Sequence, residues 1–159
     1  MLDRCGRTDP VMTREDINSE RLRRLFEYWQ SKCGGRPLPA RAALDPVDFS
    51  YALANVALVD VLRDPLRFRF RLVGTEIVRR DGTDLTGKYT DDHPLPEYRA
   101  LLRDTYRAVV ASGRPAVFRR ERMMDDKLRQ YEVLYLPLAA DGVTVDMLLV
   151  GIDFPESHG

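Results

Sequence analysis

The chain holds few side chains whose type and spacing could do chemistry, and its histidines, His93 and His158, are the first candidates for an iron ligand. His158 is the second residue from the end of the sequence. His93 stands in the polar segment DDHP, whereas a haem ligand needs apolar surroundings to hold the macrocycle. We therefore interpret His93 as a solvated loop histidine.

Carboxylates could supply general acid–base catalysis or metal ligands. The pairs at 91–92 and 125–126 fall in predicted turns, where aspartate bonds its own backbone. Asp60 differs because it lies within an apolar strand; if buried, it needs a partner such as an arginine, and its pKa would be perturbed. No hydroxyl or thiol nucleophile has a histidine that the fold would obviously bring near it. We predict no catalytic residue and no metal site, and we interpret Asp60 as half of a structural ion pair or part of an exposed strand face.

Two periodic patterns predict the elements that carry these residues. Residues 56–62 form a nearly continuous apolar run, and the apolar residues of 68–73 alternate with arginines, so together they predict a β-hairpin. A short helix, a long helix from about Pro96 and three more strands follow, at 116–124, 129–138 and 144–153. This order predicts an α+β fold, a five-stranded antiparallel sheet with helices on one face.

A separate amphipathic helix precedes the sheet. Thr13 and Asp16 have the spacing of a capping box, and Gly34 and Gly35 end the pattern, so the helix spans about five turns. Its apolar stripe must be buried against the other face of the sheet or against a second subunit. We predict a homodimer interface at Leu22, Leu25, Phe26 and Trp29.

The 159 residues suffice for one domain. We expect a flexible leader at 1–12, the amphipathic helix at 13–35, the domain at 36–154 and a flexible tail at 155–159. There is no apolar run long enough to span a bilayer and no pattern of a secretory signal. With only Cys5 and Cys33, a reduced cytoplasmic protein is the simplest interpretation.

This order of elements resembles the PAS domain, in which five antiparallel strands cup helices around a central cavity. It is similar in particular to a family of short, mostly single-domain PAS-like proteins of proteobacteria. The resemblance implies a sensory or protein-interaction module and leaves the ligand open. The segments that carry it are LxxLFEYW at 22–29, GGRPLPARAALDP at 34–46, VALVDV at 56–61, RFRLVGTEIV at 69–78 and DLTGK at 84–88.

The resemblance also bears on cofactors. Some PAS domains bind haem through an imidazole, and light-sensing ones bind flavin beside a reactive cysteine. The matching segment here, TEIVRRDG, has no cysteine, and Cys33 lies outside the predicted core. We therefore expect neither haem nor flavin.

Two arginine clusters could bind nucleic acid, since they could neutralise phosphates. In a PAS-like sheet the second and third strands are opposite edges, so the clusters would not merge, and charged edges resist aggregation. Because 25 Lys and Arg balance 25 Asp and Glu, we expect no nucleic-acid partner and no membrane binding. The clusters are Arg67, Arg69, Arg71, Arg79 and Arg80, and Arg119, Arg120 and Arg122.

Alternation also predicts which side chains face the interior. Apolar walls with tyrosine hydroxyls suit a small ligand, although the same residues could form a filled core. The candidates are Phe68, Phe70, Leu72, Ile77, Tyr89, Leu102, Tyr106, Tyr135 and Leu149.

The leading hypothesis is therefore a stand-alone sensory or protein-interaction module in signal transduction, which is not an enzyme. It would act on a protein partner when the apolar stripe of its leading helix shifts against the sheet, biased by a small ligand or by that partner. Two alternatives remain: a small α+β hydrolase or isomerase that uses the cavity and Asp60, and a scaffold with a filled core and no ligand.

Overall fold

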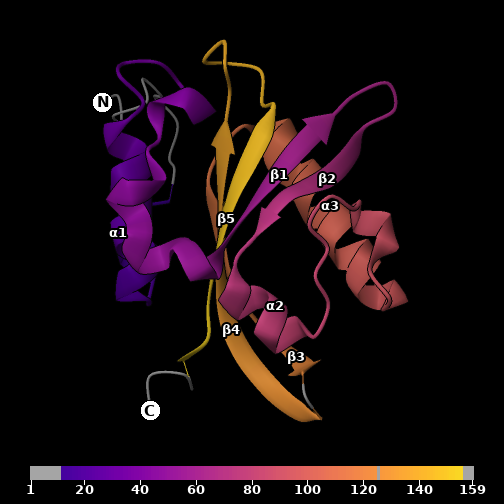
Figure 1. The fold of residues 1–159 in the computed structure, drawn as a ribbon. Helices are drawn as coiled ribbons and strands as arrows, with labels where there is room; N and C mark the ends of the chain where they lie inside the picture. The colour runs from indigo at the N-terminus through magenta and orange to yellow at the C-terminus, as the bar shows by residue number, and fades with distance from the viewer. Residues whose placement is uncertain (1–11, 125, 156–159) are drawn as a thin grey trace.

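A five-stranded antiparallel sheet forms the centre of the fold. The computed structural model of the chain describes residues 12–124 and 126–155, so the predicted leader and tail lie almost wholly outside the described residues. The strand order, β2-β1-β5-β4-β3, confirms the predicted sheet and puts the second and third strands at opposite edges (Figure 1). The strands are β1 (Val56–Leu62), β2 (Arg67–Val73), β3 (Ala116–Met124), β4 (Lys127–Leu138) and β5 (Met147–Asp153).

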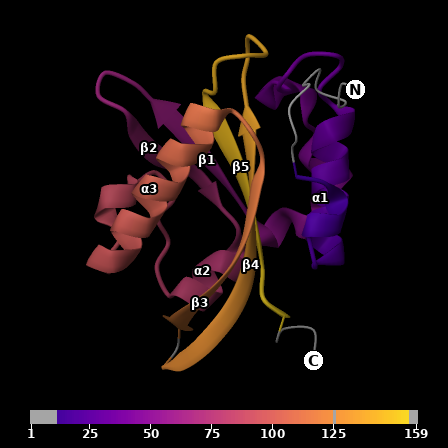
Figure 2. The ribbon, with the colours of Figure 1, turned by 180° about the vertical axis from the view of Figure 1, so that it is seen from behind.

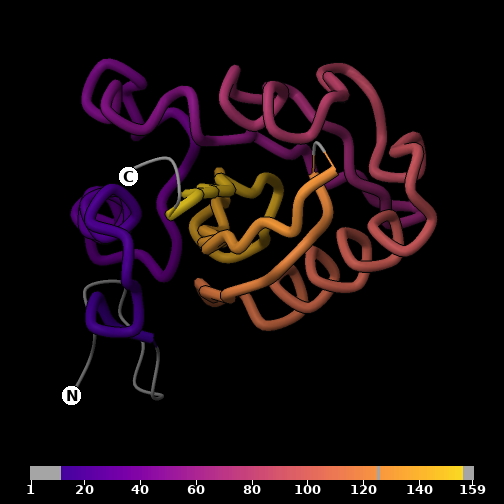
Figure 3. The backbone as a smooth tube through the Cα atoms, turned by 90° about the horizontal axis from the view of Figure 1, so that it is seen from below, coloured from indigo at the N-terminus to yellow at the C-terminus, as the bar shows by residue number. Residues whose placement is uncertain are grey.

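Helices cover both faces of this sheet, as the two opposite views in Figures 1 and 2 show. One face carries α2 (Thr75–Asp81) and α3 (Pro96–Ser112), and the other carries α1 (Glu20–Ser31), beside which packs the 3-10 segment η3 (Pro46–Asn55). Seen from below in Figure 3, β4 and β5 lie between α1 on the left and α3 on the right. The predicted grouping on one face thus holds for α2 and α3, and α1 covers the other face, which was one of the two predicted places for its apolar stripe.

The start of α1 differs from the prediction. The Thr13 N–H does donate to Asp16 Oδ2 at 2.7 Å, but this box closes only the short 3-10 turn Arg14–Asp16. The helix itself begins after Ser19, whose hydroxyl accepts the N–H of Leu22 at 3.2 Å. It is 12 residues long, shorter than the predicted five turns, because the extended backbone at Ile17 separates the two caps.

The side chains of β2 change face part of the way along the strand. Phe70 is 5% exposed, but Leu72 is 40% exposed. Leu58 of β1 pairs with Leu72 and Val59 pairs with Phe70, so β2 has one residue more than β1 at this bulge. An extra residue moves the side chains beyond it to the opposite face. The prediction that Leu72 faces the interior is therefore wrong.

The apolar stripe of α1 is buried within the chain. Gly151 of β5 permits a close approach, since a Cβ there would lie 2.8 Å from Leu22 Cδ2 and 3.0 Å from Leu25 Cδ2. The Trp29 indole N–H donates to the Pro137 carbonyl of β4 at 2.9 Å. The chain's own sheet thus occupies the stripe, and the prediction of a homodimer interface on it is wrong for all four residues, which are at most 2% exposed: Leu22, Leu25, Phe26 and Trp29.

Cys33 follows α1 and belongs to the hydrophobic core, not to a segment outside it. It is 1% exposed and disulfide-bonded, unlike the reduced thiol that we expected. The chain's other cysteine, Cys5, lies outside the described residues. Within the ranges that the structure describes, no helix combines the length and the apolar character needed to cross a membrane.

Candidate ligand cavity

A cavity of about 50 Å³ lies between the sheet and the helices α2 and α3. A space of this size holds about three or four water molecules or a ligand of similar size. All five strands contribute apolar or tyrosine side chains to its wall, and β3 contributes Arg122 in addition to Met124. The helices and the loop between them supply further apolar groups, tyrosine side chains and three other polar residues, Asp81, Thr83 and His93.

The structure places five of the predicted cavity residues in this wall: Phe70, Ile77, Leu102, Tyr106 and Tyr135. Of the other four, Phe68 is buried but does not line the cavity, and the predictions for the remaining three are wrong. Leu72 is turned outward by the bulge in β2. Leu149 is fully buried but faces α1, because its neighbour Val150 lines the cavity and successive strand residues face opposite sides. The Tyr89 ring lies outside the cavity, stacked on the Arg67 guanidinium at 3.8 Å.

A buried polar cluster at the cavity was missed from the sequence. His93 is 2% exposed, not solvated as predicted, and its Nε2 lies 3.1 Å from Asp81 Oδ2. The other carboxylate oxygen of Asp81 accepts a hydrogen bond from Arg122. Arg122 also stacks on the ring of Tyr98, with 3.9 Å between the guanidinium carbon and the ring centroid. Three distant segments meet here, so local patterns do not reveal the cluster; the inward register of Arg122 on its strand was the one available signal.

The hydrogen bonds of His93 define its protonation. Its Nδ1 accepts the backbone N–H of Leu95 at 3.1 Å, so Nδ1 carries no proton. The proton is therefore on Nε2, which donates to Asp81. Both ring nitrogens are engaged, and His93 could ligate a metal only by giving up one of these bonds. Among the described residues, no group of three or more histidine, cysteine, aspartate or glutamate side chains could hold a metal ion.

Four tyrosines surround the cavity: Tyr98, Tyr106, Tyr131 and Tyr135. The Tyr106 ring packs edge-on against Phe68, with 5.4 Å between the ring centroids, and against Tyr135, with 5.9 Å. Phe68 is 2% exposed, which agrees with its prediction as an interior residue. Burial raises the pKa of Tyr135 to about 12 and raises those of the other three hydroxyls. All four therefore keep their protons at neutral pH and can act as hydrogen-bond donors.

These buried hydroxyls predict a loss of stability in alkali. A tyrosine whose folded pKa is raised keeps its proton while the unfolded chain releases one, so stability is full below about pH 10 and falls as the pH rises toward the folded pKa. For Tyr135 the window runs from about pH 10, the unfolded value, to about 12. Within it we expect the free energy of unfolding to fall by about 1.4 kcal/mol per pH unit from this group.

Urea unfolding across this pH window measures the slope. We expect Tyr135→Phe to lose less stability per pH unit than the wild type, because the variant cannot release the proton. Tyr89→Phe, which removes a hydroxyl outside the cavity, is the matched control. Equal slopes in Tyr135→Phe and the wild type would contradict the burial of this hydroxyl.

Asp60, the residue on which the enzyme alternative rested, does not line the cavity. It is 6% exposed and lies on the other face of the sheet. Its carboxylate accepts from Arg71 Nε at 2.9 Å and Arg69 Nη2 at 3.1 Å. The interpretation of Asp60 as part of a structural ion pair agrees with this geometry, and the use of Asp60 for catalysis in the cavity does not.

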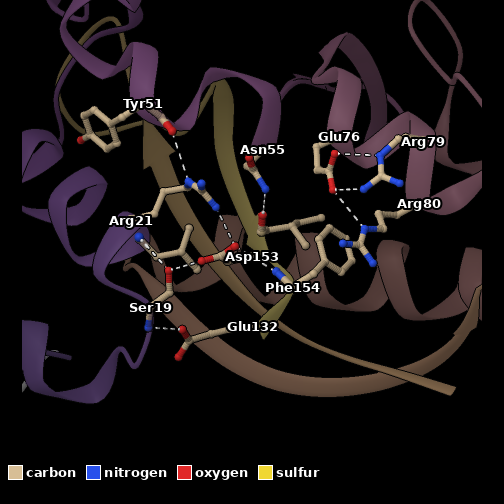
Figure 4. Close-up of polar contacts among 12 residues, drawn as sticks. Ser19, Arg21, Tyr51, Asn55, Glu76, Arg79, Arg80, Glu132, Asp153 and Phe154 are labelled. Carbon is tan, nitrogen blue, oxygen red and sulfur yellow. Dashed lines mark hydrogen bonds and ion pairs between the residues drawn. The ribbon is translucent and has the colours of Figure 1, made fainter. Parts of the chain in front are cut away.

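Polar contacts tie α1 and η3 to the end of the sheet (Figure 4). Ser19 donates its hydroxyl to Asp153 Oδ2 at 2.5 Å and its N–H to Glu132 Oε1 at 2.7 Å. Arg21 Nη1 lies 2.8 Å from Asp153 Oδ1, and its Nε donates to the Tyr51 carbonyl at 3.1 Å. Asp153 closes β5, so the start of α1 is fastened to the end of that strand.

The same end of β5 reaches α2 (Figure 4). The Arg80 guanidinium of α2 lies 5.0 Å from the ring centroid of Phe154, which follows Asp153, and its Nε donates to Glu76 Oε1 at 3.0 Å. The Phe154 side chain also lines the cavity. Residues 153 and 154 therefore connect α1, α2 and the cavity.

The arginines of the two clusters have partners within the chain. Arg79 pairs with Glu76, Arg119 with Glu132, and Arg120 Nη2 donates to Thr105 Oγ1 at 3.3 Å. Arg69, Arg71 and Arg122 pair with the aspartates named above. The absence of a nucleic-acid partner stays a prediction, and these internal pairings give the clusters a structural role.

Comparisons with known proteins test the resemblance. The PAS domain family matches residues 17–152 of the chain. No curated protein matches. Matching solved structures include a variant of RsLOV, at 16% identity and a TM-score of 0.47 over 70% of this chain and 69% of that one. An RNA-binding light-oxygen-voltage receptor matches at 14% identity and a TM-score of 0.47. The match covers 71% of this chain and 34% of the receptor chain.

The PAS domain of BvgS from Bordetella pertussis matches at 16% identity and a TM-score of 0.47, over 74% of this chain and 91% of that one. The family match covers nearly all of the described residues, from just before α1 to the last residue but one of β5. The predicted resemblance is confirmed, and the chain belongs to the PAS domain family.

Proposed function

We propose that this PAS domain is a sensory or protein-interaction module in signal transduction that holds a small ligand in its cavity and signals through α1. PAS domains are generally sensory or interaction modules, which supports the first part. The observation that carries the proposal is that strand β5 contacts the cavity with one face and α1 with the other.

The alternation of β5 makes this double contact. Val150 lines the cavity, and the next residue, Gly151, packs against Leu22 and Leu25 of α1. Asp153 and Phe154 repeat the arrangement, since Asp153 is bonded to Ser19 at the start of α1 and Phe154 lines the cavity. A ligand that moves the cavity side of β5 would therefore change the packing of α1, provided that it binds one arrangement better than the other.

The volume of the cavity bears on the alternatives. A drug-sized ligand or a cofactor needs about 300 Å³ or more, whereas this cavity measures about 50 Å³. The core is therefore nearly filled, and the space suits a ligand of a few heavy atoms. Native mass spectrometry of the protein purified from its own cells tests occupancy: a small molecule lost on denaturation supports the proposal. A bare protein mass supports a scaffold without a ligand only if the protein also binds no small molecule added back to it.

Gly151→Ala tests the link to α1. The added Cβ would lie 2.8 Å from Leu22 Cδ2, closer than real Cβ contacts, so the tip of Leu22 must move. We expect the free energy of unfolding to fall by about 1–3 kcal/mol and the amides of α1 to exchange hydrogen faster than in the wild type. Hydrogen exchange read by mass spectrometry on peptides of α1 measures this.

The matched control is Val143→Ala, a change at a side chain that is 68% exposed in the loop before β5. It should leave the exchange of α1 unchanged. If Gly151→Ala also leaves α1 unchanged while the protein stays folded, the sheet does not control the helix, and signalling through α1 is excluded.

A further inference from the structure

The cavity wall carries four tyrosine hydroxyls and one arginine as hydrogen-bond donors, and among the described residues that line it only one has a carboxylate. These hydroxyls belong to Tyr98, Tyr106, Tyr131 and Tyr135, and that of Tyr135 accepts a hydrogen bond from Arg120, which leaves its own proton for another acceptor. Arg122 Nε is buried and has no hydrogen-bond partner among these residues. The one carboxylate in the wall, that of Asp81, is already engaged by His93 and Arg122.

Burial keeps these tyrosine hydroxyls protonated. It raises the pKa of Tyr98 and Tyr106 far above the usual value and that of Tyr135 to about 12, so none of these hydroxyls becomes an acceptor anion at neutral pH. A buried donor without a partner, such as Arg122 Nε, is costly. An occupant that offers several acceptor lone pairs and no donor would satisfy the most groups.

Arg120 does not line the cavity, but its positive charge acts on two of the tyrosines that do. Asp81 balances Arg122, with exposed fractions of 9% and 13%, and His93 is neutral because its Nδ1 is an acceptor. Arg120 stands behind Tyr131 and Tyr135, and its charge lowers the pKa of both hydroxyls against the larger effect of burial. Its side chain donates to Thr105 and hydrogen-bonds Tyr135, and its Nε has no hydrogen-bond partner among the described residues. An anion in the cavity would be attracted by this charge.

We infer that the cavity binds a small monocarboxylate, of the size of acetate or propionate, with its carboxylate toward Arg122 and the tyrosine hydroxyls. The inference rests on the proposed function, whose ligand it places in a chemical class. The wall holds both kinds of group that such a molecule needs, the donors for its carboxylate and apolar side chains such as Phe70, Ile77 and Val150 for its carbon atoms. A charged carboxylate accepts stronger hydrogen bonds than a neutral group of the same shape.

Titration with sodium acetate against acetamide tests this class. The two probes have the same shape and number of heavy atoms, and only acetate carries a charge. A ligand this small reaches a dissociation constant no tighter than about 40 µM, so ligand-observed NMR and thermal unfolding are suitable readouts. We expect acetate to bind at least about tenfold more tightly than acetamide, with sodium chloride at equal ionic strength as the reference.

Two variants locate the binding. Tyr135→Phe removes only a hydroxyl of the cavity, and Arg122→Lys keeps a positive charge near Asp81 but removes the Nε donor. We expect each to weaken acetate binding about tenfold, while Tyr89→Phe, outside the cavity, leaves it unchanged. Circular dichroism shows whether each variant is folded. If Arg122→Lys is not folded, Tyr135→Phe alone is enough to locate the binding site.

Each outcome decides the point. Equal affinities for acetate and acetamide, no binding of either, or acetate binding that Tyr135→Phe leaves unchanged would overturn the carboxylate inference. The native mass spectrum distinguishes failure of the carboxylate inference from failure of the proposed function. A retained neutral molecule would keep the ligand-binding module and reject the carboxylate, and a bare protein that also binds no acetate would reject both.

Discussion

Replacing Asp81 with asparagine is expected to lower the free energy of unfolding by about 3–5 kcal/mol. Asparagine keeps the shape of the side chain and removes its charge, which leaves the buried guanidinium of Arg122 without a counterion. The carboxylate of Asp81 uses one oxygen to accept from His93 and the other to accept from Arg122, whereas the amide of asparagine has only one oxygen. Domains of this size unfold with about 5–15 kcal/mol, so the loss is a large part of the total.

Urea unfolding followed by far-ultraviolet circular dichroism measures this effect. The matched control is Asp104→Asn on α3, because Asp104 pairs with Arg103 but its side chain is 68% exposed. Exposed pairs contribute about 0–1 kcal/mol, so this variant should unfold close to the wild type. Similar small losses in both variants would show that the pair beside the cavity is well solvated, contrary to the burial of its members.

A double variant separates the charge from the packing. Adding Arg122→Met to Asp81→Asn removes the uncompensated cation and keeps an apolar side chain of similar length, and apolar replacements of buried ion pairs are often tolerated. We expect the double variant to be more stable than the two single losses added together would give. Additive losses would mean that Arg122 and Asp81 do not depend on each other.

The fold could be predicted because its signals are local. The apolar run of β1, the alternation at Phe68 and Phe70 and the turns between the last three strands are set by residues close in sequence, and together they define the sheet and its order. The bulge is different. It depends on how β2 pairs with β1, so alternation read along β2 alone puts Leu72 on the wrong face.

The polar cluster needed the tertiary structure. Asp81 and His93 are 12 positions apart and Asp81 and Arg122 are 41 apart, and neither spacing corresponds to a helix face or a strand pair. A histidine in a polar segment such as DDHP therefore has no local sign of burial. For α1 a sign did exist: Gly151 stands inside an apolar strand, where glycine often marks a close approach of another element.

The burial of the α1 stripe leads to the second large effect. Trp29→Ala is expected to lower the free energy of unfolding by about 3–5 kcal/mol, because it leaves a cavity under a side chain that is 2% exposed. Trp29→Phe keeps most of the volume but leaves the Pro137 carbonyl without its donor, so about 1–3 kcal/mol should be lost. Glu27→Ala, at an exposed position of the same helix, is the control.

The concentration dependence of unfolding then distinguishes the chain's own sheet from a second copy as the partner of Trp29. If the stripe is covered within one chain, the urea midpoint of the wild type is the same at every protein concentration, since folding is unimolecular. If two chains covered each other's stripes, dilution would lower the midpoint by mass action. A midpoint that falls on dilution in the wild type but not in Trp29→Ala would therefore restore the dimer interface, whereas a constant midpoint makes α1 an internal element whose packing a ligand can shift.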